Sequence, residues 1–487
     1  MLFNSIDFAI FFPIVFVLYW LVAKNLTLRN ALILGSSYFF YGWWDVKFLL
    51  LIILSSFVDF IVGKSIGKQT NRKKNLLFAS LFVNLGLLFY FKYTNFLIQS
   101  FVDSFTFFGG KIEVSTLNII LPVGISFYTF QTLSYTIDIY RNKLKPTKNW
   151  LAFFSFVAFF PQLVAGPIER ASHLLPQFYK TYKFNYNQVK SGLLLVAFGL
   201  FKKMIIADRA AILVNQVYNN STDYNGVETI IATILFAFQI YCDFSGYSDI
   251  AIGISRTLGF DLMKNFDSPY FSKSITEFWR RWHISLSTWF RDYVYIPLGG
   301  SKKGKNRTYV NLFIVFIVSG LWHGAAITFL IWGVIHGFII VLEKATKNLR
   351  VNIYSKLGLI KNSISYKILF SLITFTIVSF AWIFFRANNF KDAMHIVNGL
   401  FENNYIILFT SNLYKLGLIR SELIILAISI ISLLIFEILN RRNNIQVILN
   451  RQPMFFRWIT YLLIVFVLII FGIYGDNDTS QFIYFQF

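Results

Sequence analysis

The sequence is poor in cysteine and in charge. Its one cysteine, Cys242, excludes a disulfide within the chain and gives no redox compartment. Charged residues make up 14% of the chain, against about 25% in average globular proteins. Acidic side chains are the scarcer kind, 23 against 45 basic ones. This shortage of charge argues against a soluble globular protein.

Sequence patterns of nucleotide and metal sites are also missing. The phosphate-loop pattern Gly-x-x-x-x-Gly-Lys-Ser/Thr does not occur. None of the five histidines forms the pair, with a carboxylate between, that a zinc-binding helix uses. We therefore expect no metal site and no permanently bound cofactor.

Hydrophobic residues, by contrast, make up 56% of the chain, in apolar runs that recur from end to end. Several runs reach the length of about 20 residues that a membrane helix needs. The sequence predicts an all-α polytopic membrane protein with about 10–12 transmembrane helices. No linker sets a soluble domain apart, which favours one membrane-embedded domain over residues 1–487. The first run, 6–23, follows no basic residue, so we expect a retained helix and no cleaved signal peptide.

The net charge of +22 would suggest nucleic acid in a soluble protein. Here the basic residues lie mostly in short loops between apolar runs, which is typical of loops on the cytoplasmic side. This rule assigns three loops to the cytoplasm: 64–74, 301–307 and 344–350. Four arginines precede the last apolar run: Arg441, Arg442, Arg451 and Arg457. "GDNDTS" follows that run without Lys or Arg, so we expect the tail 476–487 to be extracytoplasmic.

The segment 272–293, "SKSITEFWRRWHISLSTWFRDY", differs from the spans. Helical spacing places most of its apolar side chains on one stripe, with Ile284 as the misfit, and predicts one amphipathic helix at the membrane interface. The stripe consists of Ile275, Phe278, Trp279, Trp282, Leu286, Trp289, Phe290 and Tyr293. His283 falls at its border. A plain interfacial anchor is one interpretation; the dense Trp and Arg favour a further role.

The run 308–342 contains no charged residue apart from two histidines. Its length, about 52 Å as one helix, is just enough for two passes, and basic residues at both ends favour a hairpin. His323 then lies deep in the membrane between Gly320 and Gly324, where an ionisable group indicates function. The alternative is a neutral imidazole that bonds a neighbouring helix, an interpretation that we favour for His336.

These residues also carry a family resemblance. "FWRRWHISLSTWFRDYVYIPLGG" together with "SGLWHG" resembles the bacterial membrane-bound O-acyltransferases, and most closely the branch that exports acetyl groups to alginate or peptidoglycan. "FFPQLVAGPIER", "YCDFSGYSDIAIGISRTLGFDLMKNFDSPY" and "WIFFRA" match further blocks in the same order, so the resemblance covers nearly the whole chain. It implies a ring of helices around a central tunnel, with amphipathic and re-entrant helices.

The resemblance also implies site residues. His323 matches the catalytic histidine and His283 the second motif position, with acetyl-CoA as the donor substrate. A neutral His323 could accept the proton of the acceptor hydroxyl. Donor-binding or tunnel roles are expected for Trp279, Arg280, Trp282, Trp322, Asp243 and Ser245. For Asp243 and Ser245, hydrogen bonds between helices are an equal alternative.

The tail "QFIYFQF" resembles the end of the small partner protein in D-alanylation systems, where a tyrosine is thought to carry the acyl group. This implies that Tyr484 is an acyl acceptor or carrier, whereas an aromatic belt at the interface is the alternative. Because no extracytoplasmic domain is evident, the resemblance also implies a separate partner of the SGNH esterase-like kind that acetylates an envelope polysaccharide. We expect a bacterial cytoplasmic membrane protein that contacts lipid and acetyl-CoA, and no nucleic acid.

Two other functions compete with acyl transfer. A transporter or flippase of a lipid-linked envelope precursor would favour two similar halves and deep paired charges, and the sequence shows neither. A structural scaffold of the cell envelope would not need His323. Acyl transfer, with acetyl as the favoured group, is therefore the leading hypothesis.

Overall fold

The computed structural model describes most of the chain. The described residues are 1–68, 71–107, 117, 119–361, 363–402, 416–443, 445–474, 482 and 483. Within these ranges every regular element is a helix, which confirms the all-α prediction.

The chain contacts divide it into two compact units. Unit 1 comprises Met1–Val196 with Ile250–Met263, and unit 2 comprises Ala197–Asp249 with Lys264–Phe487. The helices α9 and α11 have residues in both. Whether the two units work as the single domain expected from the sequence stays a prediction.

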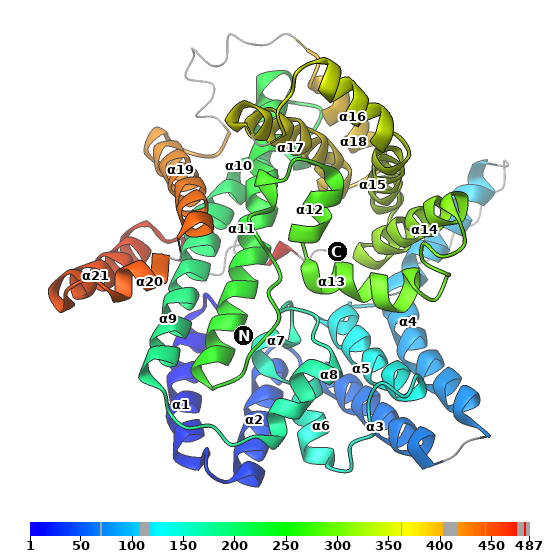
Figure 1. Cartoon of the computed structure of the whole chain (residues 1–487), viewed down its shortest axis with the longest axis vertical. Helices are drawn as coiled ribbons and strands as arrows, with labels where there is room; N and C mark the ends of the chain where they lie inside the picture. Colours follow the sequence, from blue (N-terminus) through cyan, green and yellow to red (C-terminus); the bar gives the residue numbers. More distant parts are fainter. Residues whose placement is uncertain are drawn as a thin grey trace. The chain divides into compact units, whose positions relative to one another are not determined.

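Among the described residues, unit 1 contains α1 to α8, one short 3₁₀ turn and most of α9, which follow one another along the chain in Figure 1 from blue to green. They are α1 (Ile6–Val22), α2 (Leu26–Gly42), α3 (Val46–Lys68), α4 (Lys73–Phe107), α5 (Ile125–Tyr140), α6 (Trp150–Val157), α7 (Phe160–Leu163), α8 (Ala171–Leu174), η1 (Leu175–Tyr179) and α9 (Tyr186–Leu200). The helices α3, α4 and α5 pack around the fully buried Asp59. Its carboxylate accepts bonds from Ser80 at 2.6 Å and Asn84 at 2.9 Å, which satisfies a polar group that lipid could not.

Unit 2 contains the remaining elements. They are η2 (Phe201–Ala207), α10 (Asp208–Asn219), α11 (Val227–Thr257), η3 (Pro269–Phe271), α12 (Ile275–Arg281), α13 (Ile284–Phe290), η4 (Arg291–Tyr295), α14 (Lys305–His323), α15 (Ile327–Ala345), α16 (Lys347–Lys356), α17 (Ile364–Arg386), α18 (Phe390–Gly399), α19 (Arg420–Arg442), α20 (Ile445–Asn450) and α21 (Met454–Phe471). A core rich in aromatic rings runs through α11, α12, α15 and α17.

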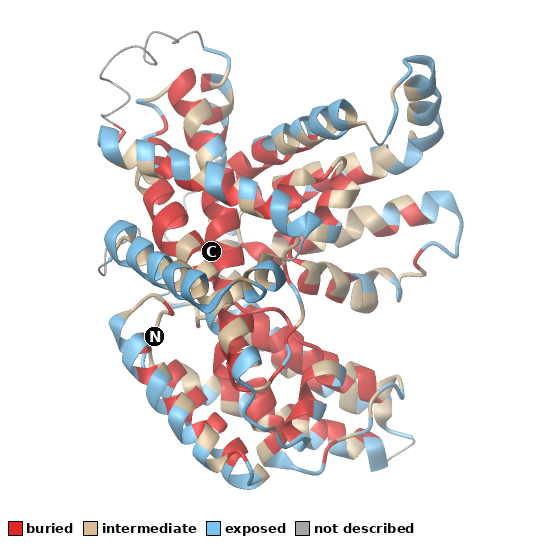
Figure 2. Cartoon of the chain, turned by 60° about the vertical axis from the view of Figure 1, so that its left-hand side comes forward, coloured by how far each residue is buried: buried red, intermediate tan, exposed pale blue. Residues whose placement is uncertain are grey.

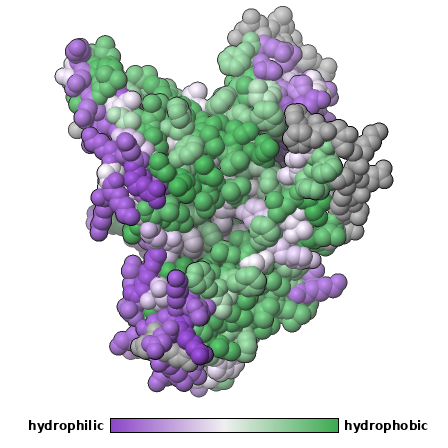
Figure 3. Space-filling view, turned by 90° about the vertical axis from the view of Figure 1, so that its right-hand side faces the viewer, coloured by the Kyte–Doolittle hydropathy of each residue, from purple (hydrophilic) through white to green (hydrophobic). Residues whose placement is uncertain are grey.

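Seven of the described helices are long and apolar enough to cross a membrane: α3, α4, α11, α15, α17, α19 and α21. The stretches Ile6–Val22 and Trp150–Leu163 are apolar but shorter. Large apolar side chains face outward, among them Phe82, which is 81% exposed, and Phe455, which is 78% exposed. Within each unit the buried residues gather on inner helices and the outer helices carry exposed strips (Figure 2). The face in Figure 3 is mostly hydrophobic, with hydrophilic side chains in separate patches, as expected for contact with lipid.

The structure corrects the prediction of one continuous helix over 272–293. The segment forms two short helices, α12 and α13, with a break at Trp282 and His283. His283 has φ 44°, a left-handed conformation that ends one helix and redirects the next. Helical periodicity continues on both sides of the break, so the sequence pattern alone does not reveal it.

Candidate active site

His323 is the last residue of α14, at the turn of a tight helical hairpin. The helices α14 and α15 run side by side, as Figure 1 shows. Two glycines permit this approach, because a Cβ on Gly320 would lie 2.4 Å from the Phe329 carbonyl oxygen, and one on Gly333 equally close to that of Phe316. The predicted hairpin is therefore confirmed, and glycine packing fixes the position of His323.

Aromatic rings surround His323, which is 4% exposed. Its ring centroid lies 4.9 Å from that of Trp322, 5.1 Å from Trp332 and 5.3 Å from Phe385. The imidazole of His323 therefore lies among the aromatic side chains of the buried core. Within the described ranges, no three His, Cys, Asp or Glu side chains gather in a group that could hold a metal ion.

His283 is fully buried and is held by Asn265. The Nδ1 atom of His283 lies 3.2 Å from the Asn265 side-chain oxygen, which also accepts the Ser285 hydroxyl at 2.9 Å. The Asn265 amide donates to Ser248 at 3.0 Å, which fixes the orientation of the amide. Because that oxygen can only accept, Nδ1 of His283 carries the proton and Nε2 is the accepting nitrogen. Burial lowers the pKa of His283 to about 3, so the ring is neutral at physiological pH.

The structure brings the two histidines together although 40 positions separate them. Their ring centroids are 6.4 Å apart, and the ring of Trp322 lies 6.1 Å from that of His283. The two predicted site residues therefore lie in one buried region, where their imidazole rings are neighbours. Such a site can accept a proton and orient a hydroxyl group.

The predicted tryptophans line the same core, but Arg280 does not. Trp279 and Trp282 are buried, whereas Arg280 is exposed. The indole nitrogen of Trp279 donates to Nδ1 of His336 at 3.3 Å, which agrees with the structural role favoured for His336. The ring of Trp282 packs 5.1 Å from that of Trp382.

Asp243 and Ser245 lie on α11 and bond to lysines. Asp243 pairs with Lys203 at 2.7 Å, and Ser245 accepts a bond from Lys202 at 3.0 Å. Asp243 also accepts the backbone N–H of Ile483 at 2.7 Å. Tyr484, the next residue, lies outside the described residues, so its role stays a prediction.

The sequence reasoning missed three features of these surroundings. Asn265 lies in the quoted block "DLMKNFDSPY", yet nothing local in the sequence shows that it reaches His283. Lys203 sits in an apolar run, where a buried lysine signals a partner. Glu169 and His173 lie four positions apart and pair with each other, although Glu169 precedes the short helix α8 that carries His173.

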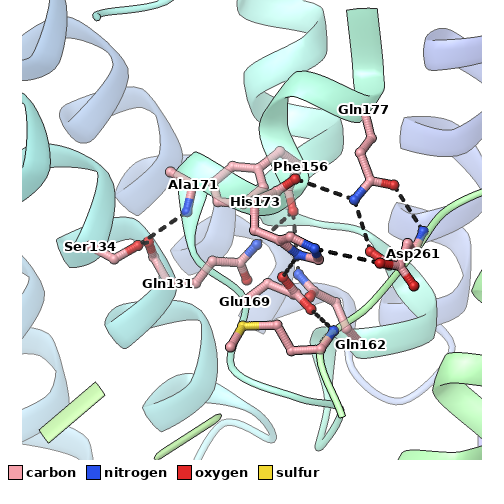
Figure 4. Close-up of polar contacts among 10 residues, drawn as sticks. Gln131, Ser134, Phe156, Gln162, Glu169, Ala171, His173, Gln177 and Asp261 are labelled. Atoms are coloured by element: carbon pink, nitrogen blue, oxygen red, sulfur yellow. Dashed lines mark hydrogen bonds and ion pairs between the residues drawn. The ribbon is translucent and has the colours of Figure 1, made fainter. Parts of the chain in front are cut away.

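That Glu169–His173 pair belongs to a polar cluster in unit 1, drawn in Figure 4. Glu169 lies 2.7 Å from Nδ1 of His173 and accepts the backbone N–H of Met263 at 2.5 Å. The Asp261 carboxylate lies 3.6 Å from Nε2 of His173, and Gln177 bonds the Asp261 backbone twice at 2.8 Å. The hydrogen bond to Glu169 raises the pKa of His173 above its usual value.

Comparison with known proteins extends these observations. A family model described as MBOAT, membrane-bound O-acyltransferase family, matches residues 33–350. The chain is 40% identical over 407 residues to a probable alginate O-acetylase of Pseudomonas aeruginosa, covering 82% of this chain and 75% of that protein. It is 36% identical over 432 residues to a peptidoglycan O-acetyltransferase of Helicobacter pylori, covering 82% and 80%.

A more distant relative is a teichoic acid D-alanyltransferase of Bacillus subtilis. It is 30% identical over 235 residues, which covers 46% of this chain and 58% of that protein. The family match extends through the break at His283 and through the hairpin whose turn holds His323, and the chain belongs to the membrane-bound O-acyltransferase family.

Proposed function

We propose that this protein takes an acyl group, with acetyl favoured, from a cytoplasmic thioester and passes it across the membrane for O-acetylation of an envelope polysaccharide. The buried pair His283–His323 is the observation that carries the proposal. The relatives named as acetylases of alginate and peptidoglycan support the acetyl group and the polymer class. Acetyl-CoA is the proposed donor substrate.

His323 is the proposed general base. Its imidazole takes the proton of the acceptor hydroxyl as the oxygen attacks the thioester carbonyl. The carbon–sulfur bond then breaks, and the leaving thiolate takes the proton back from the imidazolium. His283, neutral and with Nε2 accepting, is proposed to orient the hydroxyl beside His323.

Tyr484 is the proposed acceptor of the acyl group. A phenol of pKa about 10 is protonated at neutral pH and needs a base. The neighbouring residues support this assignment, because Phe482 and Ile483 are buried in unit 2 and the ring of Phe482 packs on Phe244, which in turn packs on His283. An extracytoplasmic partner of the SGNH esterase-like kind would then take the acyl group from the tyrosyl ester.

Radiolabelled acetyl-CoA and the purified protein in nanodiscs test the proposal. Released CoA and protein-bound acetyl are measured for wild type, His323→Ala and Tyr484→Phe. His323→Ala should lower the rate by about 10²–10⁴-fold, the usual contribution of a general base. His395→Ala, a histidine of α18, is the matched control and should keep the rate. Equal rates of CoA release in wild type and His323→Ala would refute the proposed acyltransferase function.

For the carrier, intact mass should show one acetyl in wild type and none in Tyr484→Phe. An unchanged acetyl mass in the Phe variant, or full overall transfer by it, contradicts a role for Tyr484. The polymer is tested separately by mass spectrometry of envelope glycan from a deletion strain, in which O-acetyl groups should disappear.

A further inference from the structure

Three buried charged side chains gather between η2, α10 and α11. The ammonium group of Lys203 lies 2.8 Å from Asp208 and 2.7 Å from Asp243. The three side chains are 8%, 2% and 4% exposed. One lysine faces two carboxylates, so the cluster has an excess of negative charge when all three groups are ionised. Burying such a group is costly unless further hydrogen bonds compensate it.

The C-terminal segment supplies such a bond. The backbone N–H of Ile483 donates to the Asp243 oxygen that does not face Lys203, at 2.7 Å. Ile483 is 2% exposed and Phe482 is 1% exposed, although chain ends are usually loose. The ring of Phe482 lies 5.0 Å from that of Tyr247 and 6.0 Å from that of Phe244. These two residues are therefore packed as core residues are.

The chain that leads into this segment is held at the same place. After α21 ends, the N–H of Ile473 donates to the Met204 carbonyl of η2 at 3.1 Å. The Arg209 guanidinium donates to the Phe471 carbonyl at 2.9 Å. The element η2 is a π-helix, whose wider turn often marks functional sites in helices. One short region thus holds the chain on both sides of residues 474–482.

A glycine on α11 lets the helix approach η2 closely enough to form this region. A Cβ on Gly246 would lie 2.8 Å from the Gly199 carbonyl oxygen and 3.3 Å from the Lys203 nitrogen. Lys203 and Asp243 could not keep their 2.7 Å contact if the two backbones moved apart. The charged cluster is therefore built by the backbone as well as by its side chains.

We propose that Lys203, Asp208 and Asp243 form a receptor for the C-terminal segment of this chain, with Asp243 as the positioning residue. Asp243 of the receptor accepts a hydrogen bond from the backbone N–H of Ile483. The ring of Phe482 packs against the rings of Phe244 and Tyr247. The ring of Phe244 lies 6.0 Å from that of Phe482 and 4.6 Å from that of His283, so one ring separates Phe482 from the histidine pair. The bearing of the docked segment on acyl transfer rests on the proposed function, whereas the docking itself does not.

Alkylation of a reporter cysteine in the full chain tests the docking. Ile483→Cys keeps the backbone N–H, so it should react slowly with a small permeant maleimide. Adding Asp243→Leu removes the acceptor and leaves Lys203 paired with Asp208 alone, which makes the cluster formally neutral. Alkylation of the reporter should then rise about tenfold or more, as expected for loss of a charged hydrogen bond. Asp249→Asn, on the same helix but paired with Lys202, is the matched control and should leave the reporter protected.

Cys242 reports on global unfolding in the same experiment. It is fully buried and next to Asp243 in the sequence, so peptide mass spectrometry of both cysteines separates undocking from unfolding. The proposal requires that the reporter reacts while Cys242 stays protected. An unchanged reporter rate in Asp243→Leu, or equal exposure of both cysteines, overturns it.

A second comparison removes the donor in place of the acceptor. With Phe482→Cys as the reporter, Ile483→Pro deletes the N–H whereas Ile483→Val keeps it. The proline variant should be alkylated about tenfold faster or more, and equal rates contradict the receptor. Acetyl transfer, measured in parallel, keeps the two proposals distinct. Transfer retained by His323→Ala refutes the proposed function alone, and an unchanged reporter refutes the receptor alone.

Discussion

The protein places histidines in two opposite surroundings. His173 of unit 1 is partly exposed, and carboxylates face both of its ring nitrogens. His283 of unit 2 is fully buried, with an amide oxygen at one nitrogen and aromatic rings around it. The pKa of His173 is raised by the bond to Glu169, whereas that of His283 is lowered to about 3 by burial.

The difference shows how one side chain is assigned two tasks. Carboxylate partners favour the protonated form of a histidine and raise its pKa. A histidine among rings stays neutral and can accept a hydrogen bond or a proton. Only the second kind suits a site that must take a proton from a hydroxyl group.

The largest effect should come from the glycine packing that holds the buried pair. Gly320→Ala would place a Cβ 2.4 Å from the Phe329 carbonyl oxygen, so the hairpin must shift. We expect a loss of about 1–3 kcal/mol in unfolding free energy and about 100-fold in acetyl transfer, because His323 moves with the hairpin. Thermal unfolding and the acetyl-CoA assay measure both. Gly86→Ala, whose Cβ would meet nothing within 4 Å, is the control, and a Gly320→Ala protein as active as that control would contradict the prediction.

A carboxylate beside His283 should give this histidine surroundings like those of His173 and should reduce the difference between their pKa values. Asn265→Asp places a carboxylate at Nδ1 of His283 and raises the pKa of that histidine by about 1–3 units. Since the pKa starts at about 3, the ring stays neutral at pH 8 and gains charge as the pH falls toward 5. Acetyl transfer should therefore fall more steeply on acidification than in wild type.

A pH–rate profile from pH 5 to 8.5 measures this change. Asn95→Asp serves as the control, since Asn95 lies on α4 and bonds the backbone of Leu117. Parallel profiles for wild type and Asn265→Asp would show that the amide does not govern the protonation of His283.

Glu169→Gln removes a carboxylate from His173 and should have a smaller effect, on the stability of the protein. His173 has a raised pKa in the folded state, so its pairing stabilises the protein below the ordinary pKa of about 6.5 and the stabilisation is lost as the pH rises through the folded pKa. The difference in thermal midpoint between wild type and Glu169→Gln should thus be larger at pH 6 than at pH 9. Because His173 is partly exposed, about 1 kcal/mol or less is expected.

The control for this exchange is Glu402→Gln, an exposed carboxylate of unit 2. It should show no pH-dependent difference from wild type in the same scans. A Glu169→Gln difference that grows with pH would have the wrong sign and would reject the raised pKa of His173.

The smallest effect is expected at the exposed Arg280. If Arg280 contributes to donor binding, as the family resemblance implies, Arg280→Gln should raise KM for acetyl-CoA by at most about fivefold, since an exposed ion pair contributes about 0.2–1 kcal/mol. The effect should shrink at high salt, and kcat should hold. Arg291→Gln, another exposed arginine, is the control. A change in kcat alone would place Arg280 outside donor binding.

Much of this site could be predicted from the sequence, and the exceptions have physical reasons. The length of the uncharged run 308–342 and the basic residues at both of its ends predicted a hairpin, and the hairpin is confirmed. The break at His283 was missed, since a left-handed residue other than glycine leaves no trace in helical periodicity. Asn265 was missed because its contact with His283 joins residues that are 18 positions apart, with η3 and α12 between them. Such contacts depend on tertiary packing and are invisible in a local pattern.

The hydrogen bond between Ile483 and Asp243 has a consequence for how often the receptor is occupied in the cell. A carrier on a separate protein would occupy its site according to the amount of that protein and its affinity. Here the segment is tethered ten positions after Ile473, so its local concentration is set by the chain, on the order of millimolar for a short tether. Occupancy of the receptor is therefore independent of the stoichiometry between two gene products.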